Sequence, residues 1–168
     1  LVGATAIRSV DVIVTPSPPL TMGVAAWLLG LWHRAPFIYN VQELYPDVAI
    51  KMGAVRNRHL IRLLFWLERF VYARAAVITL IAPHMARQVS AKGVPDSRIV
   101  VIPNFVDAEA LGPVPGPNSF TREHGLGGKF LVSYAGNLGP LQGLHSLVDA
   151  AAQLRQDPDI LVALVGAG

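Results

Sequence analysis

The 168-residue sequence contains no cysteine, which excludes a disulfide framework and any metal site built on thiolates. Charged residues make up only 15% of the chain, and the formal net charge is +3. So small a basic surplus does not indicate a nucleic-acid partner, and we expect none. Apolar runs of membrane-spanning length are also missing. The run from Met22 to Trp32 is too short to cross a bilayer and is typical of a buried core helix.

Apolar residues are abundant instead, at 52% of the chain, which is typical of parallel strands covered by helices on both faces. Short strand-like runs alternate with helical patterns over the first hundred residues. The runs are 11–15, 37–41, 77–81 and 98–102, and the helical patterns are 20–34, 57–75 and 83–92. This alternation predicts an α/β fold with a doubly wound parallel sheet.

A connector rich in proline and glycine follows residue 102 and interrupts this alternation, because neither residue suits a helix interior or a central strand. A second alternation then starts with a strand at 130–135 and continues with a strand at 160–165. We therefore expect two Rossmann-like units, 1–102 and 119–168, joined by a connector at 103–118. The chain starts on Leu1 and stops at Gly168, directly after a strand-like run. We interpret it as an interior piece of a longer protein, with both units incomplete.

Three glycines interrupt the second alternation directly after residues 130–135. Gly136, Gly139 and Gly143 are followed by apolar residues at helical spacing over 144–154. A strand, a glycine turn and a helix point backbone amides and a helix dipole at an anion, and the missing Cβ lets a phosphate approach the backbone. The alternative is an ordinary turn that binds nothing.

The carboxyl end of the second strand carries polar residues. Gln42, Glu43 and Asp47 follow residues 37–41, at the edge where ligands bind in open α/β sheets. They are predicted either to meet a substrate or to cap a following helix. His84, near the start of another predicted helix, could also approach a ligand. The helix at 57–75 mixes arginines with aromatic residues, which suits either an anionic membrane surface or a core helix with solvated arginines.

Four stretches together resemble the GT-B glycosyltransferases of the family 4 group, in the branch that builds fucosamine- or colanic-acid-type polysaccharides. Their order and spacing carry the resemblance over essentially the whole chain. The stretches are Ser-Pro-Pro-Leu at 17–20, Val-Gln-Glu-Leu-Tyr-Pro at 41–46, Val-Ile-Pro-Asn-Phe-Val-Asp at 101–107 and Tyr-Ala-Gly-Asn-Leu-Gly-Pro-Leu-Gln-Gly-Leu at 134–144.

The resemblance implies a nucleotide-diphosphate-sugar as donor, and the sequence itself requires no cofactor. It places Glu43 as the candidate catalytic residue, with Gln42 and Asp47 on the acceptor side. Asn137 and Gln142 stand where most relatives carry Arg and Lys, so the charge on the diphosphate must be met by a cation from elsewhere, by a metal, or by the backbone alone. The donor-binding residues that it implies are Gly136, Asn137, Leu138, Gly139, Gln142, Gly143 and Gly166.

The resemblance further implies retaining transfer of a sugar in surface polysaccharide or glycolipid synthesis. The acceptor would be a polyprenyl-linked sugar, used by a cytoplasmic protein peripheral on the inner membrane face. We expect the 168 residues alone to be inactive. A nucleotide-sugar epimerase using Glu43 and His84 and a non-catalytic membrane-docking module remain as alternatives. A dinucleotide-dependent oxidoreductase fits less well, because Gly136-Asn-Leu-Gly139 has the wrong spacing for that motif.

Overall fold

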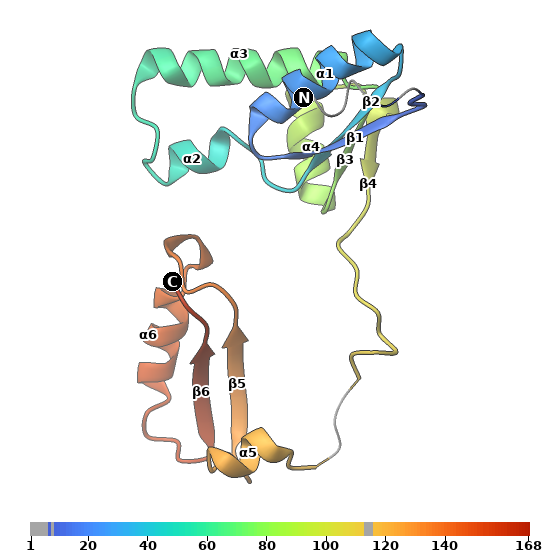
Figure 1. The fold of residues 1–168 in the computed structure, drawn as a ribbon. Helices are drawn as coiled ribbons and strands as arrows, with labels where there is room; N and C mark the ends of the chain where they lie inside the picture. Colours follow the sequence, from blue (N-terminus) through green and yellow to red (C-terminus); the bar gives the residue numbers. More distant parts are fainter. Residues whose placement is uncertain (1–6, 8, 113–115) are drawn as a thin grey trace. The chain divides into compact units, whose positions relative to one another are not determined.

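The structure is a computed structural model that describes residues 7, 9–112 and 116–168. It divides into two units, Leu1–Phe105 and Val106–Gly168, so the division falls inside the predicted connector. Figure 1 traces the elements of both units. The first unit contains β1 (Ile13–Ser17), α1 (Leu20–His33), β2 (Phe37–Val41), α2 (Asp47–Lys51), α3 (Arg58–Arg74), β3 (Val77–Leu80), α4 (Pro83–Ala91), the 3-10 turn η2 (Asp96–Arg98) and β4 (Ile99–Val101).

The sheet of the first unit is parallel throughout, with the strand order β1-β2-β3-β4. Thr15, Tyr39, Ile78 and Ile99 are aligned across it, so their side chains share one face. Tyr39 and Ile78 are completely buried there, in a core that α3 and α4 complete. The predicted α/β architecture with parallel strands and intervening helices is confirmed for this unit.

Helix α3 begins where Asn57 caps it, since the Asn57 side chain accepts hydrogen bonds from the amides of His59 and Leu60. It packs closely on α1. A Cβ added at Gly23 would lie 2.3 Å from a methyl group of Val71, so only glycine allows this approach of the two helices.

Two details of the first unit differ from the sequence-based expectation. Strand β1 runs through Pro16 to Ser17, beyond the end predicted at residue 15. Proline is tolerated there because β1 lies at an edge of the sheet formed by the described residues. The short helix α2 was not expected, since a helix of five residues leaves no periodic apolar pattern.

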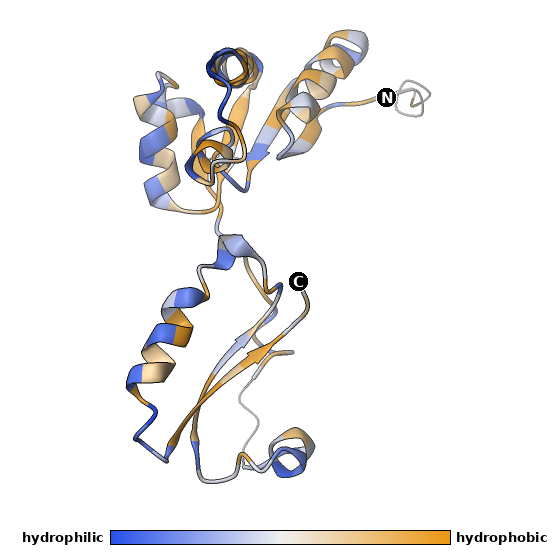
Figure 2. Ribbon diagram, turned by 90° about the vertical axis from the view of Figure 1, so that its left-hand side faces the viewer, coloured by the Kyte–Doolittle hydropathy of each residue, from blue (hydrophilic) through white to orange (hydrophobic). Residues whose placement is uncertain are grey.

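The second unit contains α5 (Ser119–Glu123), β5 (Phe130–Ala135), the 3-10 turn η3 (Pro140–Gln142), α6 (His145–Gln153) and β6 (Ile160–Val165). Strands β5 and β6 pair in parallel, from Phe130 opposite Ile160 to Ala135 opposite Val165. The strand, glycine turn and helix predicted after residue 130 are therefore present. Figure 2 shows hydrophilic and hydrophobic residues alternating along α6, as expected for an amphipathic helix.

Candidate functional site

A cavity of about 290 Å³ opens at the carboxyl ends of β2 and β3 in the first unit. The segment that follows β2 brings Gln42, Glu43 and Asp47 into its wall, and the start of α4 contributes His84. The three residues predicted for the acceptor side and for catalysis thus line one cavity. Lys51 of α2 lines it as well, a cation that the sequence motifs did not single out.

The side chain of Gln42 is oriented by a chain of hydrogen bonds across the sheet. Its Nε2 donates to Oδ1 of Asn40, and Nδ2 of Asn40 donates to Oγ1 of Thr79 at 3.0 Å. The backbone amide of Gln42 also donates to the carbonyl of Ser17 at 3.4 Å. Strand positions in β1, β2 and β3 hold these groups, so hydrogen bonds tie Gln42 to the carboxyl edge of the sheet.

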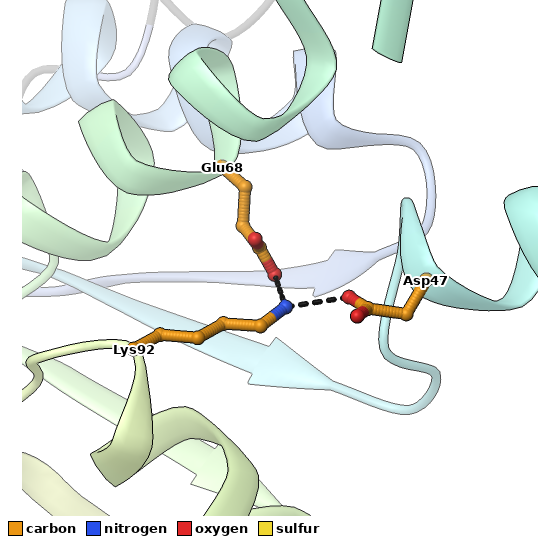
Figure 3. A network of polar contacts seen from close by, with 3 residues as sticks. All are labelled: Asp47, Glu68 and Lys92. Atoms are coloured by element: carbon orange, nitrogen blue, oxygen red, sulfur yellow. Dashed lines mark hydrogen bonds and ion pairs between the residues drawn. The ribbon is translucent and has the colours of Figure 1, made fainter. Parts of the chain in front are cut away.

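Asp47 takes part in a network that links α2, α3 and the end of α4. Nζ of Lys92 lies 2.5 Å from Oδ2 of Asp47 and 2.6 Å from Oε1 of Glu68, as Figure 3 shows. The side chain of Glu68 is only 3% exposed, whereas those of Lys92 and Asp47 are 24% and 27% exposed. The carboxylate of Glu68 therefore depends on Lys92 for its ion pair within the described part of the chain.

Burial dominates the electrostatics of this network. It raises the pKa of Glu68 above its usual value, and the hydrogen bond and charge of Lys92 oppose that rise only in part. Burial also raises the pKa of Tyr72, and the nearby charge of Glu68 adds to the effect. Sequence reasoning missed Glu68 and Lys92. No motif marks them, and the buried face of α3 includes Glu68 beside Val71 and Tyr72.

The glycine turn of the second unit begins as an extension of the parallel sheet. The amide of Gly136 donates to the carbonyl of Val165 at 2.9 Å, and the amide of Leu138 donates to the carbonyl of Ala167 at 3.0 Å. Gly166 lies directly against this segment, since a Cβ on it would meet the carbonyl oxygen of Gly136 at 1.7 Å. The amides of Gly136 and Leu138 are thus already used within the protein.

The amides of Asn137 and Gly139 make no hydrogen bond within the described residues. Gly139 lies between two polar side chains, because a Cβ there would lie 3.0 Å from both Nδ2 of Asn137 and Oε1 of Gln142. These groups form a small polar cradle on an exposed turn. Two backbone amides and one side-chain carboxamide can donate hydrogen bonds to an anion, although none of these groups carries a charge.

A second cavity of about 290 Å³ lies beside this turn and is lined by Leu138, Gly139 and the start of α6. His145, the first residue of α6, is in its wall, and sequence reasoning did not select it. Its position directly after the glycine turn, at the start of a helix, is the sequence signal that marks it as a candidate site residue. Gly143 ends η3 with φ at +61° and does not line the cavity; neither do Gly136, Asn137, Gln142 and Gly166.

No cluster of three or more histidine, aspartate or glutamate side chains placed to hold a metal ion occurs among residues 7, 9–112 and 116–168. In the same ranges, no helix combines the length and hydropathy needed to cross a membrane.

Parallel α/β units that gather polar residues at the carboxyl ends of their strands are typical of nucleotide-binding α/β proteins. Residues 2–104 match a family model described as the glycosyl transferase 4-like domain. The chain therefore belongs to the glycosyl transferase 4-like domain family.

Two relatives extend this match over the second unit. The chain is 24% identical over 164 residues to WcaI of Escherichia coli (strain K12), named as a colanic acid biosynthesis glycosyl transferase, covering 94% of this chain and 40% of the relative. It is 24% identical over 163 residues to WbjE of Pseudomonas aeruginosa, named as a glycosyltransferase, covering 96% of this chain and 40% of the relative. The chain thus spans about two fifths of the length of these relatives.

Solved structures show the same fold. The crystal structure of Anabaena Alr3699/HepE in complex with UDP and glucose matches with a TM-score of 0.67 at 19% identity, over 92% of this chain and 40% of that one. The complex of the same protein with UDP matches with a TM-score of 0.69 at 20% identity, over 94% of this chain and 40% of that one. The predicted GT-B type of fold is confirmed.

Proposed function

We propose that this chain is part of a glycosyltransferase that moves a sugar from a nucleotide-diphosphate-sugar to an acceptor in surface polysaccharide or glycolipid synthesis. The observation that carries the proposal is the cavity at the carboxyl ends of β2 and β3. In a chain of the glycosyl transferase 4-like domain family, it gathers Gln42, Glu43 and Asp47. The names of WcaI and WbjE support the reaction class.

The glycine turn of the second unit is proposed to bind the diphosphate of the donor. The amides of Asn137 and Gly139 are available for it, and Gln142 and Asn137 supply neutral amide groups beside them. Gly136, Leu138, Gly143 and Gly166 shape the turn that presents these groups. UDP and UDP-glucose in the HepE structures support a nucleotide sugar as ligand, and preorganised donors stabilise the charge that grows on a leaving group.

The chemical step proposed is transfer with retention at the anomeric carbon. The bond between that carbon and the diphosphate oxygen breaks, and the diphosphate leaves with the electron pair. The acceptor hydroxyl forms the new bond to the same carbon and loses its proton. Glu43 is the proposed proton acceptor, because its carboxylate lines the acceptor-side cavity beside Gln42 and Asp47.

A lipid-linked acceptor at the inner membrane face is proposed from the surface of α1 and α3. Trp27 of α1 and Phe70 of α3 pack edge to face at 5.0 Å, so the two helices are neighbours. Their exposed large apolar side chains are Met22, Leu28, Leu31, Trp32, Leu60, Leu63 and Trp66. Exposed arginines also lie on α3, at Arg58, Arg62 and Arg69. Apolar and aromatic side chains near cations suit the surface of an anionic membrane.

The direct test incubates the complete gene product with a panel of nucleotide-diphosphate-sugars and short-chain polyprenyl-diphosphate-linked monosaccharides. We expect release of the nucleoside diphosphate to depend on the acceptor, and the product to keep the anomeric configuration of the donor by NMR. Nucleoside diphosphate release with no dependence on any acceptor, or an inverted product, would contradict the proposal.

A nucleotide-sugar epimerase is the second candidate, because Glu43 and His84 line the same cavity and a carboxylate with an imidazole can act as an acid–base pair. The same incubation without any acceptor separates the two. An epimerase would convert the donor sugar to its epimer under these conditions, whereas a transferase leaves the sugar configuration unchanged.

A further inference from the structure

The segment from Glu43 to Arg56 has few apolar anchors of its own. Helix α2 has a single turn, buries only Ala49, and receives no side-chain cap at its start. Leu44 and Pro46 are the other buried residues of the segment. So small a buried area gives little hydrophobic stabilisation to the position of the segment.

The polar contacts of this segment are also mostly internal. Its backbone hydrogen bonds within the described part of the chain run from one residue of the segment to another, as from Tyr45 to Glu43 and from Ala54 to Ala49. Among the described residues, the polar contact that joins the segment to the rest of the unit is the one between Asp47 and Lys92. This ion pair joins α2 to the residue that follows α4, 45 positions further along the chain.

Lys92 itself is held in place from two sides. Its Nζ lies 2.6 Å from the buried carboxylate of Glu68 and 5.6 Å from the ring centroid of Phe65, both on α3. A buried carboxylate that loses its cation is costly, so the Glu68–Lys92 pair fixes the ammonium group. The fixed ammonium group then presents its remaining hydrogen-bond capacity to Asp47 (Figure 3).

We propose that Lys92 is a positioning residue, which sets the place of the acceptor-side segment through Asp47 and thereby orients Glu43 for the acceptor. This inference rests on the proposed function only for the identity of the ligand. Lys92 itself does not line the cavity, so it acts on the site through Asp47 and contacts no substrate.

The first test measures the segment itself and needs no substrate. Lys92→Met alone would leave Glu68 as an unpaired buried charge, so the informative variant is the double substitution Glu68→Gln with Lys92→Met. Asp47→Asn breaks the same link from the other side. Arg87→Met is the matched control, because Arg87 is an exposed cation on α4 that does not line this cavity.

Hydrogen–deuterium exchange of the complete gene product is the readout. We expect amides of residues 43–56 to exchange at least about 10-fold faster in the double variant and in Asp47→Asn, because local opening follows local stability. Amides of β2 and β3 should keep their rates in both, and Arg87→Met should match the unaltered protein. Unchanged exchange at 43–56, or faster exchange throughout the unit, would overturn the proposal.

The second test uses transfer from UDP-glucose, or from the donor that the panel identifies, to the lipid-linked acceptor. The double variant and Asp47→Asn should raise the KM for the acceptor by about 10-fold or more, because a misplacement of about 1 Å in an orienting group can lower the rate by about 100-fold. The KM for the donor should stay within about twofold. Equal changes in both constants would overturn the positioning role. Absence of any transfer by the unaltered protein would refute the proposed function, and the exchange experiment would still decide the role of Lys92.

Discussion

Gly166 and Gly136 approach so closely that a Cβ on Gly166 would lie 1.7 Å from the carbonyl oxygen of Gly136. The contact joins the end of β6 to the start of the glycine turn. The hydrogen bonds of Gly136 and Leu138 to residues 165 and 167 run beside this contact, so the close approach helps to place the turn.

Gly166→Ala is expected to displace the turn and to weaken binding of nucleoside diphosphates. A contact of this length forces the backbone to shift, and the amides of Asn137 and Gly139 would shift with it. We expect affinity for UDP to fall at least about 10-fold, equivalent to about 1.4 kcal/mol, by isothermal titration calorimetry. Gly127→Ala is the control, since a Cβ there meets nothing within 4 Å, and an equal loss in that variant would contradict the argument.

Glu43→Gln should lower kcat for transfer by about 100-fold or more and leave UDP binding unchanged, because the amide cannot accept the proton of the acceptor. Steady-state kinetics with both substrates checks the rate, and calorimetry checks the binding. Gln88→Glu provides a comparison at another position in the wall of the same cavity and should affect kcat much less. A Glu43→Gln variant with full kcat would exclude a catalytic role for this carboxylate.

Lys92→Met should destabilise the first unit by about 3 kcal/mol, the low end of the range for breaking a buried ion pair. The low end applies because Lys92 and Asp47 are partly exposed, whereas Glu68 is buried. Adding Glu68→Gln should recover most of the loss by removing the unpaired charge. Urea denaturation of the single and double variants measures both effects, and a double variant as unstable as Lys92→Met would contradict the explanation.

The same Lys92→Met variant should show a distinct dependence on pH. Glu68 has its pKa raised above its usual 4.5 by burial, and loss of Lys92 removes a hydrogen bond and a positive charge that oppose the rise. A folded-state pKa above the unfolded value means that stability falls as the pH rises through the interval between them. The stability gap between variant and unaltered protein should therefore be small below pH ~4 and largest above the raised pKa. A gap independent of pH in urea denaturation would show that Glu68 is not its source.

Replacing Trp32 and Trp66 by serine should weaken binding to vesicles that contain anionic lipid. These side chains are 70% and 61% exposed, so the substitution removes apolar area without opening the core. Sedimentation with phosphatidylglycerol vesicles, at low and high salt, measures the effect. Phe105→Ser is the control, as its side chain is 93% exposed and lies on neither helix. Equal binding by the unaltered protein, the double tryptophan variant and Phe105→Ser would contradict a membrane-binding surface on α1 and α3.

Much of the fold could be predicted from the sequence. The strand bounds at 37–41, 130–135 and 160–165 match those observed, because each is a short apolar run bounded by turn residues such as proline or glycine. Pro16 within β1 could not be predicted, since tolerance for proline depends on which strand lies at the edge of the described sheet. The one-turn helix α2 depends on its tertiary surroundings in the same way.

The candidate site was predictable only in part. The position of Gln42, Glu43 and Asp47 at the carboxyl end of a strand placed them in one cavity. The ion pair of Asp47 with Lys92 joins residues 45 positions apart, and no pattern of residue spacing in the sequence predicts a contact between them. The sequence predicts that backbone amides of the glycine turn point at an anion, and this role stays a prediction. Two of these amides, those of Gly136 and Leu138, bind backbone carbonyls in the structure.

The most direct test of the central claim is an NMR titration of the ¹⁵N-labelled complete gene product with UDP, GDP and ADP. The account predicts that at least one of these nucleotides shifts the amide resonances of Asn137 and Gly139, while those of Gly127 and of β2 stay in place. Shifts confined to the first unit, or none at the glycine turn with any of the three, would contradict it.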